Sequence, residues 1–320
     1  MNNIEYLVVS SSVDFSTDLI CIELHERKKK YLRLNRDSFR DYEISYSLQN
    51  QEMSIRANDD MYIIKKDNLR GVLFRAPVFL RSHKNYNVNE QLYRSQWSSF
   101  IRNLIVFDRA KWINNPVKTY QSENKLFQLQ CAKNAGLLTP KTFVGNVLPQ
   151  NIIPTNDYII KSLDTALFYD GSQEYFTYTS VVNGNELLDS NIKEAPVILQ
   201  EFFEDKLDIR VTVIGNRLFP VSITKNGKNI YGDWRKNPKD VLQYKPIMLP
   251  DDISDKITKL MRELGLIFGG VDLVYTNKKY YFIEVNPTGE WGWLTHYSDI
   301  PLEKVIVNEL VSEEKDEKYF

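Results

Sequence analysis

The sequence is poor in the residues that build disulfide frameworks and transition-metal sites. Its 320 residues include two cysteines, Cys21 and Cys131, which form no CxxC pair. The three histidines, His25, His83 and His296, stand too far apart to form an HxH or HExxH group. We therefore expect buried free thiols and no zinc site. A metal in this protein would be held by carboxylates.

Neither sign of charge dominates, and long apolar runs are missing. Lys and Arg total 41 against 42 for Asp and Glu, so no overall field attracts the chain to nucleic acid or to an anionic membrane. The apolar segments are broken by charge or proline and are shorter than the roughly 18 to 20 residues of a membrane-spanning helix. The first residues do not follow the pattern of a signal peptide. We expect a cytoplasmic protein that binds neither nucleic acid nor membranes.

The length favours two or three modules, because one domain usually takes roughly 100 to 200 residues. The apolar run at 5–14 predicts a buried strand that opens an α/β module. Apolar spacing predicts an amphipathic helix over 89–107, and a second helix is expected over 122–137 with Ser122 as its N-cap. The turn-rich segment WINNPVKTY separates these helices. We place a domain boundary within it, at residues 114–119.

Strand patterns dominate the rest of the chain and predict a mixed or antiparallel sheet. Four of them, punctuated by proline or glycine, are 139–146, 157–163, 174–182 and 195–203. A hairpin is expected over 208–227 with its turn at Gly215 and Asn216. An amphipathic helix over 251–266 then leads into two strands over 269–287.

The closing hairpin carries three oxygen ligands. We expect Asp272 to begin its first strand and Glu284 to end the second, with Asn286 two residues later. Residues two apart share one face of a strand, and a turn near Asn277 brings Asp272 close to Glu284. Two carboxylates and an amide suit Mg²⁺, which takes hard oxygen ligands. The alternative is an exposed hairpin with solvated acids.

Four elements follow one another in the order found in ATP-grasp enzymes. They are Lys125 in ENKLFQL, Lys161 in YIIKSL, the segment QEFF at Gln200 to Phe203, and the strand pair VDLVY and FIEVNP. Over residues 115–300 the sequence resembles this superfamily. The resemblance implies an α/β (α+β) ATP-grasp fold with a pre-ATP-grasp domain at 1–115, a central domain at 116–199 and a C-terminal mixed-sheet domain at 200–320. It also implies ATP and Mg²⁺ as cofactors.

The resemblance also locates the nucleotide. Lys125 and Lys161 would neutralise its phosphates, and Lys161 needs a buried partner because it lies in an apolar strand. The acidic hinge consists of Gln200, Glu201, Phe202 and Phe203. There the glutamate would accept from the adenine amino group, the backbone would read the ring edge, and the aromatic rings would pack near the base. The alternatives are solvated surface lysines and an ordinary core strand.

The segment DIR places Asp208 and Arg210 on one face of a strand directly after the hinge. Because an arginine fork binds carboxylate or phosphate at two points, we expect Arg210 to hold the substrate carboxylate and its acyl phosphate, with Asp208 orienting it. The alternative is a structural salt bridge between strands. The segment 162–176 after Lys161 departs from many ATP-grasp enzymes, since it has one glycine, Gly171. A phosphate cradle made by backbone amides alone is therefore not expected.

Several segments are similar to the graspetide synthetases of the microviridin type, which modify ribosomally made peptides. They are LFRAP, WINNP, DIR, GDWR at Gly232 to Arg235, and EVNPTGEWGWL with Trp291 and Trp293. The resemblance implies that Arg235 joins Arg210 and Asp208 in the catalytic site. The alternative is that the two tryptophans simply cap the core.

This resemblance implies an ATP-dependent macrocyclase of a precursor peptide made of leader and core. ATP would phosphorylate an Asp or Glu side chain, and a Ser or Thr hydroxyl or a Lys amine of the same peptide would then form an ester or amide. A leader site at residues 170–195 and a homodimer are also implied. Two alternatives remain open: a RimK-like ligase acting on amino acids or protein termini, and a binding module that holds ATP and peptide without turnover.

Overall fold

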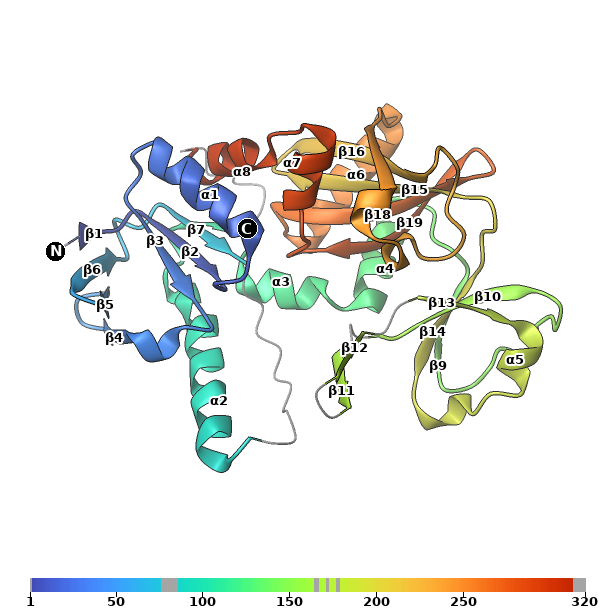
Figure 1. Cartoon of the computed structure of the whole chain (residues 1–320), viewed down its shortest axis with the longest axis horizontal. Coiled ribbons are helices and arrows are strands. Elements are labelled where there is room, and N and C mark those ends of the chain that lie inside the picture. The colour runs from blue at the N-terminus through green and yellow to red at the C-terminus, as the bar shows by residue number, and fades with distance from the viewer. Residues whose placement is uncertain (1, 76–85, 164–166, 171–172, 177–178, 313–320) are drawn as a thin grey trace.

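The computed structural model describes residues 2–75, 86–163, 167–170, 173–176 and 179–312. Their helices and sheets form a mixed α/β architecture, as predicted. In Figure 1 the N-terminal sheets lie at one end of the molecule, and the central and C-terminal sheets lie at the other. None of the helices in these ranges combines the length and apolar character required to cross a membrane.

Two four-stranded sheets form the N-terminal part. One is parallel, in the order β3-β2-β7-β8, and the other has the order β1-β6-β5-β4. The strands are β1 (Asn2–Asn3), β2 (Tyr6–Ser10), β3 (Tyr31–Asn35), β4 (Tyr42–Ser47), β5 (Glu52–Ala57), β6 (Asp60–Lys65), β7 (Gly71–Phe74) and β8 (Lys111–Ile113). The helices are α1 (Phe15–Glu26), η1 (Phe39–Asp41), α2 (Val88–Asn103) and η2 (Leu104–Val106). The predicted first strand and the helix over 89–107 are therefore confirmed.

The central part is an antiparallel sheet in the order β13-β10-β14-β9 with a separate strand pair, β11 and β12. The strands are β9 (Thr142–Gly145), β10 (Asp157–Lys161), β11 (Leu167–Asp170), β12 (Gln173–Phe176), β13 (Ser180–Asn183) and β14 (Val197–Glu201). The helices are α3 (Pro116–Ser122), α4 (Lys125–Asn134), α5 (Gly184–Leu188) and η3 (Ile192–Glu194). The single strand expected over 174–182 is wrong, because β12 and β13 belong to different sheets.

A five-stranded antiparallel sheet, β17-β16-β15-β18-β19, carries the C-terminal part. The strands are β15 (Leu207–Ile214), β16 (Arg217–Lys225), β17 (Leu242–Pro246), β18 (Phe268–Thr276) and β19 (Lys279–Asn286). The helices are η4 (Trp234–Lys236), η5 (Lys239–Val241), α6 (Asp251–Leu264), α7 (Gly292–Ser298) and α8 (Leu302–Val311). Both predicted hairpins and the helix over 251–266 are confirmed.

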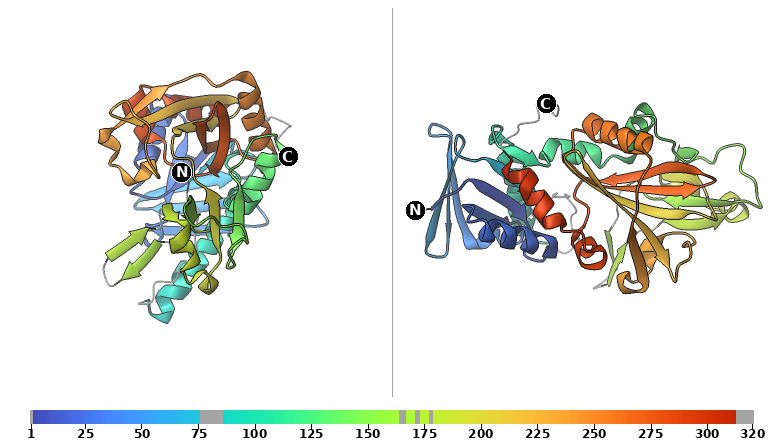
Figure 2. Two further views of the ribbon diagram at one scale, coloured as in Figure 1. Left: turned by 90° about the vertical axis from the view of Figure 1, so that its right-hand side faces the viewer. Right: turned by 90° about the horizontal axis from the view of Figure 1, so that it is seen from above.

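The C-terminal sheet is buried on both faces. One face packs against α4 and α6 through residues such as Leu260 and Phe282. The other forms a core with β2, α1, α7 and α8 that includes Leu24, Val221 and Trp291. Helix α8, which comes late in the sequence, lies beside α1, the first helix of the chain (Figures 1 and 2). Because this core combines residues from both ends of the chain, it fixes the N-terminal part to the C-terminal sheet.

Two sequence predictions around residue 120 are wrong. The segment expected to be a turn contains α3, whose first residue is Pro116 and whose N-cap is Asn115; the Asn115 side chain accepts from the N–H of Val117. Proline is favoured in the first turn because its missing N–H would have no partner there. Ser122 is therefore the last residue of α3, and α4 begins after Asn124. The domain bounds stay a prediction.

The two cysteines are free thiols, as expected. Cys131 is buried, whereas Cys21 is only partly so. Burial raises the pKa of both thiols to about 11, although Arg33 opposes this for Cys21. Both groups are therefore protonated at neutral pH and are poor nucleophiles.

Candidate functional site

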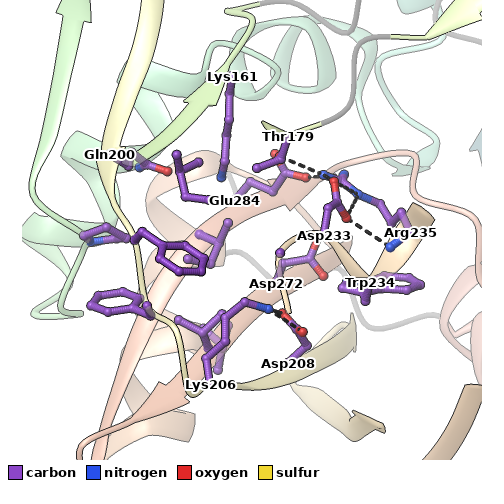
Figure 3. A pocket seen from close by; sticks show the side chains of 18 of the residues that line it. Lys161, Thr179, Gln200, Lys206, Asp208, Asp233, Trp234, Arg235, Asp272 and Glu284 are labelled. Atoms are coloured by element: carbon purple, nitrogen blue, oxygen red, sulfur yellow. Dashed lines mark hydrogen bonds and ion pairs between the residues drawn. The ribbon is translucent and has the colours of Figure 1, made fainter. Parts of the chain in front are cut away.

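A buried pocket lies where the central sheet meets the C-terminal sheet (Figure 3). It brings together most of the site residues predicted from the sequence. Those in its wall are Lys161, Gln200, Glu201, Phe202, Phe203, Asp208, Arg235, Asp272 and Glu284. The other three, Lys125, Arg210 and Asn286, border the pocket through contacts with these residues.

One end of the pocket is apolar and is formed by the hinge. Gln200 donates to the Thr142 hydroxyl at 2.9 Å, and the Glu201 carboxylate accepts from the N–H of Lys141 at 2.9 Å. The rings of Phe202 and Phe203 lie beside those of Tyr231 and Tyr281, with centroids 5.1 and 4.7 Å apart. Flat rings beside backbone edges suit a planar base. The role of Glu201 toward adenine stays a prediction, because its carboxylate already has a backbone partner.

The opposite end is polar and begins with two lysines. Lys161, the last residue of β10, extends toward Glu284 (Figure 3). Burial lowers the pKa of its ammonium, and the negative charge of Glu284 opposes this shift. The buried partner expected for Lys161 stays a prediction, with Glu284 as the carboxylate it faces (Figure 3). Lys125 begins α4 and donates to the carbonyl of Ser162 at 3.0 Å. Its charge also acts on Glu284.

The predicted metal ligands lie together on β18 and β19. Asp272 stands opposite Glu284 in the ladder, and the Asn286 amide donates to Asp272 Oδ2 at 3.4 Å. The register shifts between Asp272 and Leu273, so a bulge interrupts the pairing beside the two acids. The expectation that Asp272 begins its strand is wrong, because β18 starts four residues earlier, at Phe268. The mid-strand position buries the carboxylate, whose residue is 8% exposed.

The two acids differ in their electrostatics. Burial raises the pKa of the Asp272 carboxyl, with Arg210 opposing and Glu284 adding to the rise. Burial also acts to raise the pKa of Glu284, but Arg235 and Lys161 outweigh it and hold that pKa below its usual range. Glu284 is therefore the firmly ionised member of the pair.

Arg210 and Asp208 are not partners, contrary to the sequence prediction. The ladder between β15 and β18 sets Arg210 opposite Asp272, and their Nε and Oδ1 atoms are 3.3 Å apart. Asp208 stands opposite Val274 instead, and its oxygens lie 2.6 and 2.5 Å from the Lys206 ammonium. Strand register thus decides the pairing. Among the described residues, Arg210 Nε and Asp272 Oδ1 make no hydrogen bond, and each faces the opposite charge of the other at 3.3 Å.

Arg235 connects three parts of the site. Its guanidinium lies 3.0 Å from Glu284 Oε1 and 2.9 Å from Asp233 Oδ2, and it donates to the Thr179 hydroxyl at 3.5 Å. Burial acts to raise the pKa of Asp233, but Arg235 outweighs it and lowers that pKa overall. Trp234 completes this wall, since the Arg210 guanidinium lies 6.0 Å from its ring centre.

The sequence reasoning missed Lys206 and Asp233. Lys206 precedes Asp208 by two residues and therefore shares its face, a signal that was available. Asp233 lies inside the GDWR segment next to Arg235. Trp291 and Trp293 are 1% and 8% exposed in the core described above, so the core alternative is the correct one for both.

Replacing Lys206 with Met is expected to lower the free energy of unfolding by about 3 to 5 kcal/mol at pH 8, because Asp208 would stay buried without its counter-charge. Burial raises the pKa of Asp208 from 3.8 to about 6 while Lys206 opposes the rise, so removing Lys206 raises it further. A raised acid pKa costs stability as pH rises through that range, so the loss should be smaller at pH 5. Urea unfolding at both pH values measures this. As a control, the double variant Lys206→Met with Asp208→Asn should recover the lost free energy of unfolding. Equal losses of this free energy at pH 5 and pH 8 in Lys206→Met would contradict the pairing of Lys206 with Asp208.

The segments proposed for the lid and the leader peptide are partly outside the described residues. Residues 164–166, 171–172 and 177–178 fall there. The remainder includes the strand pair β11 and β12 and the strand β13, which is at one end of the central sheet. Within the described ranges no strand pairs with the outer edge of β13. Strand addition at this edge stays a prediction.

Comparison with known proteins agrees with this architecture. Residues 176–310 match a family model described as a RimK-like ATP-grasp domain. A probable alpha-L-glutamate ligase of Mannheimia succiniciproducens is 28% identical over 188 residues, which is 54% of this chain and 58% of that protein. The chain thus spans about three fifths of the length of this relative.

Two solved structures are similar over nearly the whole chain. The macrocyclase MdnC of Microcystis aeruginosa, solved with its precursor peptide MdnA bound, is 26% identical to this chain with a TM-score of 0.82. The similarity covers 96% of this chain and 99% of the MdnC chain. A RiPP-associated ATP-grasp ligase of Chryseobacterium gregarium, in complex with ADP and a leader and core peptide, is 23% identical with a TM-score of 0.82. The similarity covers 97% of this chain and 96% of the Chryseobacterium chain. These likenesses confirm the predicted ATP-grasp fold.

Proposed function

From the match to a RimK-like ATP-grasp domain and the likeness to MdnC, we propose that this chain is an ATP-grasp ligase that cyclises a ribosomally synthesised precursor peptide. The observation that carries the proposal is the likeness to MdnC, which extends through the N-terminal part as well as the nucleotide pocket. In the proposed reaction a side-chain carboxylate of the peptide is activated by ATP. A hydroxyl or amine of the same peptide then closes an ω-ester or ω-amide ring.

The residues present fit ATP with Mg²⁺. Asp272, Glu284 and Asn286 offer hard oxygen ligands at the polar end of the pocket, and Asp272 Oδ1 has no hydrogen-bond partner among the described residues. In the same part of the chain no group of three or more His, Cys, Asp or Glu side chains could hold a metal. The bound metal would supply positive charge against the phosphates.

The cations of the pocket divide the remaining tasks. Lys125 and Lys161 would face the nucleotide phosphates, and Arg235 would join them when phosphate oxygens compete for it with Glu284. Arg210 would hold the peptide carboxylate, since its guanidinium lies beside the proposed metal ligand Asp272. Buried, preorganised charges favour transfer because they need no rearrangement of solvent during the reaction.

The proposed chemistry has two steps. A carboxylate oxygen of the peptide attacks the γ-phosphorus, the bond to the β-γ bridging oxygen breaks, and ADP leaves. The resulting acyl phosphate is attacked at its carbonyl carbon by a Ser or Thr hydroxyl or a Lys amine, and phosphate leaves as the nucleophile loses its proton. The peptide therefore loses one water for each ring. Holding both groups in a buried site favours cyclisation over hydrolysis.

Other parts of the proposal concern binding and assembly. The leader would dock at residues 170–195, where the β13 edge offers unpaired backbone groups within the described ranges. A homodimer and a cytoplasmic location stay predictions from the sequence.

Intact mass spectrometry of a candidate precursor peptide, taken from a small open reading frame that neighbours the gene, tests the proposal. After incubation with the protein, ATP and Mg²⁺, the peptide should lose about 18 Da per ring, the mass of one water, because each ring forms by condensation of an activated carboxylate. Omitting ATP should leave its mass unchanged. An unchanged peptide in the complete reaction would contradict macrocyclisation.

A second candidate is a RimK-like ligase that joins free amino acids to a carboxylate. The match to the RimK-like domain and the likeness to a glutamate ligase favour it. ADP release that depends on an added amino acid, with a mass gain instead of a loss, would select this function. A module that binds ATP and peptide without turnover would release no ADP under either condition.

A further inference from the structure

The loop that follows Asn286 is held from outside the nucleotide pocket. Residues 287–291 connect β19 to α7, and the Asn114 amide donates to the carbonyl of Pro287 at 2.8 Å. The same Asn114 side chain donates to the carbonyl of Phe268 and accepts from its N–H, each at 2.8 Å. Asn114 is 1% exposed. The start of this loop is therefore fixed against β18, the strand that carries Asp272.

Arg75 fixes the middle of the loop from the N-terminal part. It follows β7, and its side chain is 7% exposed. Its Nε lies 3.0 Å from Asp14 Oδ2, Nη1 donates to the carbonyl of Gly289 at 3.3 Å, and Nη2 lies 3.4 Å from Glu290 Oε2. One rigid guanidinium thus joins the end of β7, the cap of α1 and the loop. LFRAP, a segment to which the sequence assigned no role, meets the segment EVNPTGEWGWL at this contact.

The far end of the loop is tied to the start of α1. Glu290 accepts from the N–H of Gly292 at 2.9 Å and from the Ser16 hydroxyl. Ser16 Oγ in turn accepts from the N–H of Gly292 at 3.0 Å. Asp14, the N-cap of α1, is held by Ser10 at 2.9 Å as well as by Arg75. The positive end of the helix and the arginine together offset the charge of Asp14, whose side chain is 11% exposed, and Arg75 also offsets part of the charge of the more exposed Glu290.

The loop also lies against the reacting end of the site. A side chain at Gly289 would come within 3.1 Å of Asn286 Cβ and 3.9 Å of Arg210 Nη1. The Gly289 backbone therefore lies between Arg75 on one side and Asn286 and Arg210 on the other. Displacing it would move a proposed metal ligand and change the space beside the proposed carboxylate-binding arginine.

We propose that Arg75 is a positioning residue for carboxylate activation: it fixes loop 287–290, and through that loop it fixes Asn286 and the surroundings of Arg210. The N-terminal part is then a component of the catalytic unit. This inference rests on the proposed function for its effect on cyclisation. Its effect on Mg²⁺-dependent nucleotide binding can be measured without any peptide.

The test compares Arg75→Met with Arg27→Met. Arg27 also joins the N-terminal part to a C-terminal element, since its Nη1 donates to Asn308 on α8 at 2.6 Å, but it does not touch the loop. Arg75→Met should lower kcat for cyclisation about 100-fold, because small displacements of reacting groups cost that much, with a smaller change in peptide KM. ADP affinity without Mg²⁺ should match the wild type. The Mg²⁺ concentration for half-maximal ADP binding should rise several-fold in Arg75→Met and stay constant in Arg27→Met.

A structural role alone predicts a different result. If Arg75→Met lowers the melting temperature as Arg27→Met does, while kcat and the Mg²⁺ dependence stay within twofold of wild type, the proposal is overturned. Should Arg75→Met fail to fold, Glu290→Gln removes the same ion pair and should show the same two changes in weaker form; wild-type behaviour there overturns the proposal equally. If the wild type cyclises no peptide, the proposed function has failed, and the Mg²⁺ titration of ADP binding still decides the role of Arg75.

Discussion

Turnover is expected to fall by about 10³-fold or more when Glu284→Gln is combined with Asn286→Ala, because the pair supplies two of the three proposed oxygen ligands. The fold should persist, since the ladder between β18 and β19 is made by the backbone. ADP and phosphate release measures turnover. Calorimetric titration of ADP with and without Mg²⁺ locates the defect, which should appear only with the metal.

A matched control exists outside the pocket. Asn134 on α4 donates to Glu263 on α6 at 2.7 Å, and both are exposed. Glu263→Gln with Asn134→Ala makes the same chemical changes at the surface and should leave turnover unchanged. Activity retained in the Glu284 and Asn286 variant would show that the metal, or the reaction, does not depend on these ligands.

Arg210→Ala should suppress acyl-phosphate formation about 10² to 10³-fold, a range seen when one preorganised donor to developing charge is removed. ADP affinity should change little, because Arg210 borders the pocket beside Asp272 and is remote from the hinge. Part of the effect will come from Asp272, which loses its ion pair with Arg210 and whose pKa is already raised by burial. Peptide-dependent ADP release and ADP titration separate the two quantities.

Arg217→Ala provides the comparison for this prediction. Arg217 begins β16, which pairs with β15, the strand that carries Arg210. Its side chain forms an ion pair with Glu309 at 3.7 Å, away from the pocket. Arg217→Ala should leave both acyl-phosphate formation and ADP affinity near the wild-type values. Equal losses of nucleotide affinity and acyl-phosphate formation in Arg210→Ala would remove the assignment of Arg210 to the substrate carboxylate.

Local patterns account for the parts of the site that could be predicted. Glu284 and Asn286 share a face because they are two residues apart, and the turn at Asn277 brings Asp272 close to Glu284. These two relations follow from local sequence, whereas the bulge beside Asp272 that sets it directly opposite Glu284 was not predicted. The same holds for the helix at α6 and for the order of lysines, hinge and hairpin, which indicated the ATP-grasp fold.

Contacts between distant segments could not be predicted in this way. Arg210 faces Asp272 instead of Asp208 because the register of β15 on β18 places them opposite each other. Arg235 reaches Glu284 because the segment before η4 folds back over the sheet. The helix α3 was missed although Asn115 and Pro116 are a recognisable helix start, because turn formers dominate its composition.

The sequence by itself determined the types of side chain in this protein, their order and the strands and most helices that carry them, because these follow from local periodicity and from charges a few residues apart. Only the tertiary structure decided which charges meet. Arg75 and Glu290 are 215 residues apart in the chain and become partners when the core of β2, α1 and α8 closes on the C-terminal sheet. Packing and strand register, which no local pattern encodes, set those distances.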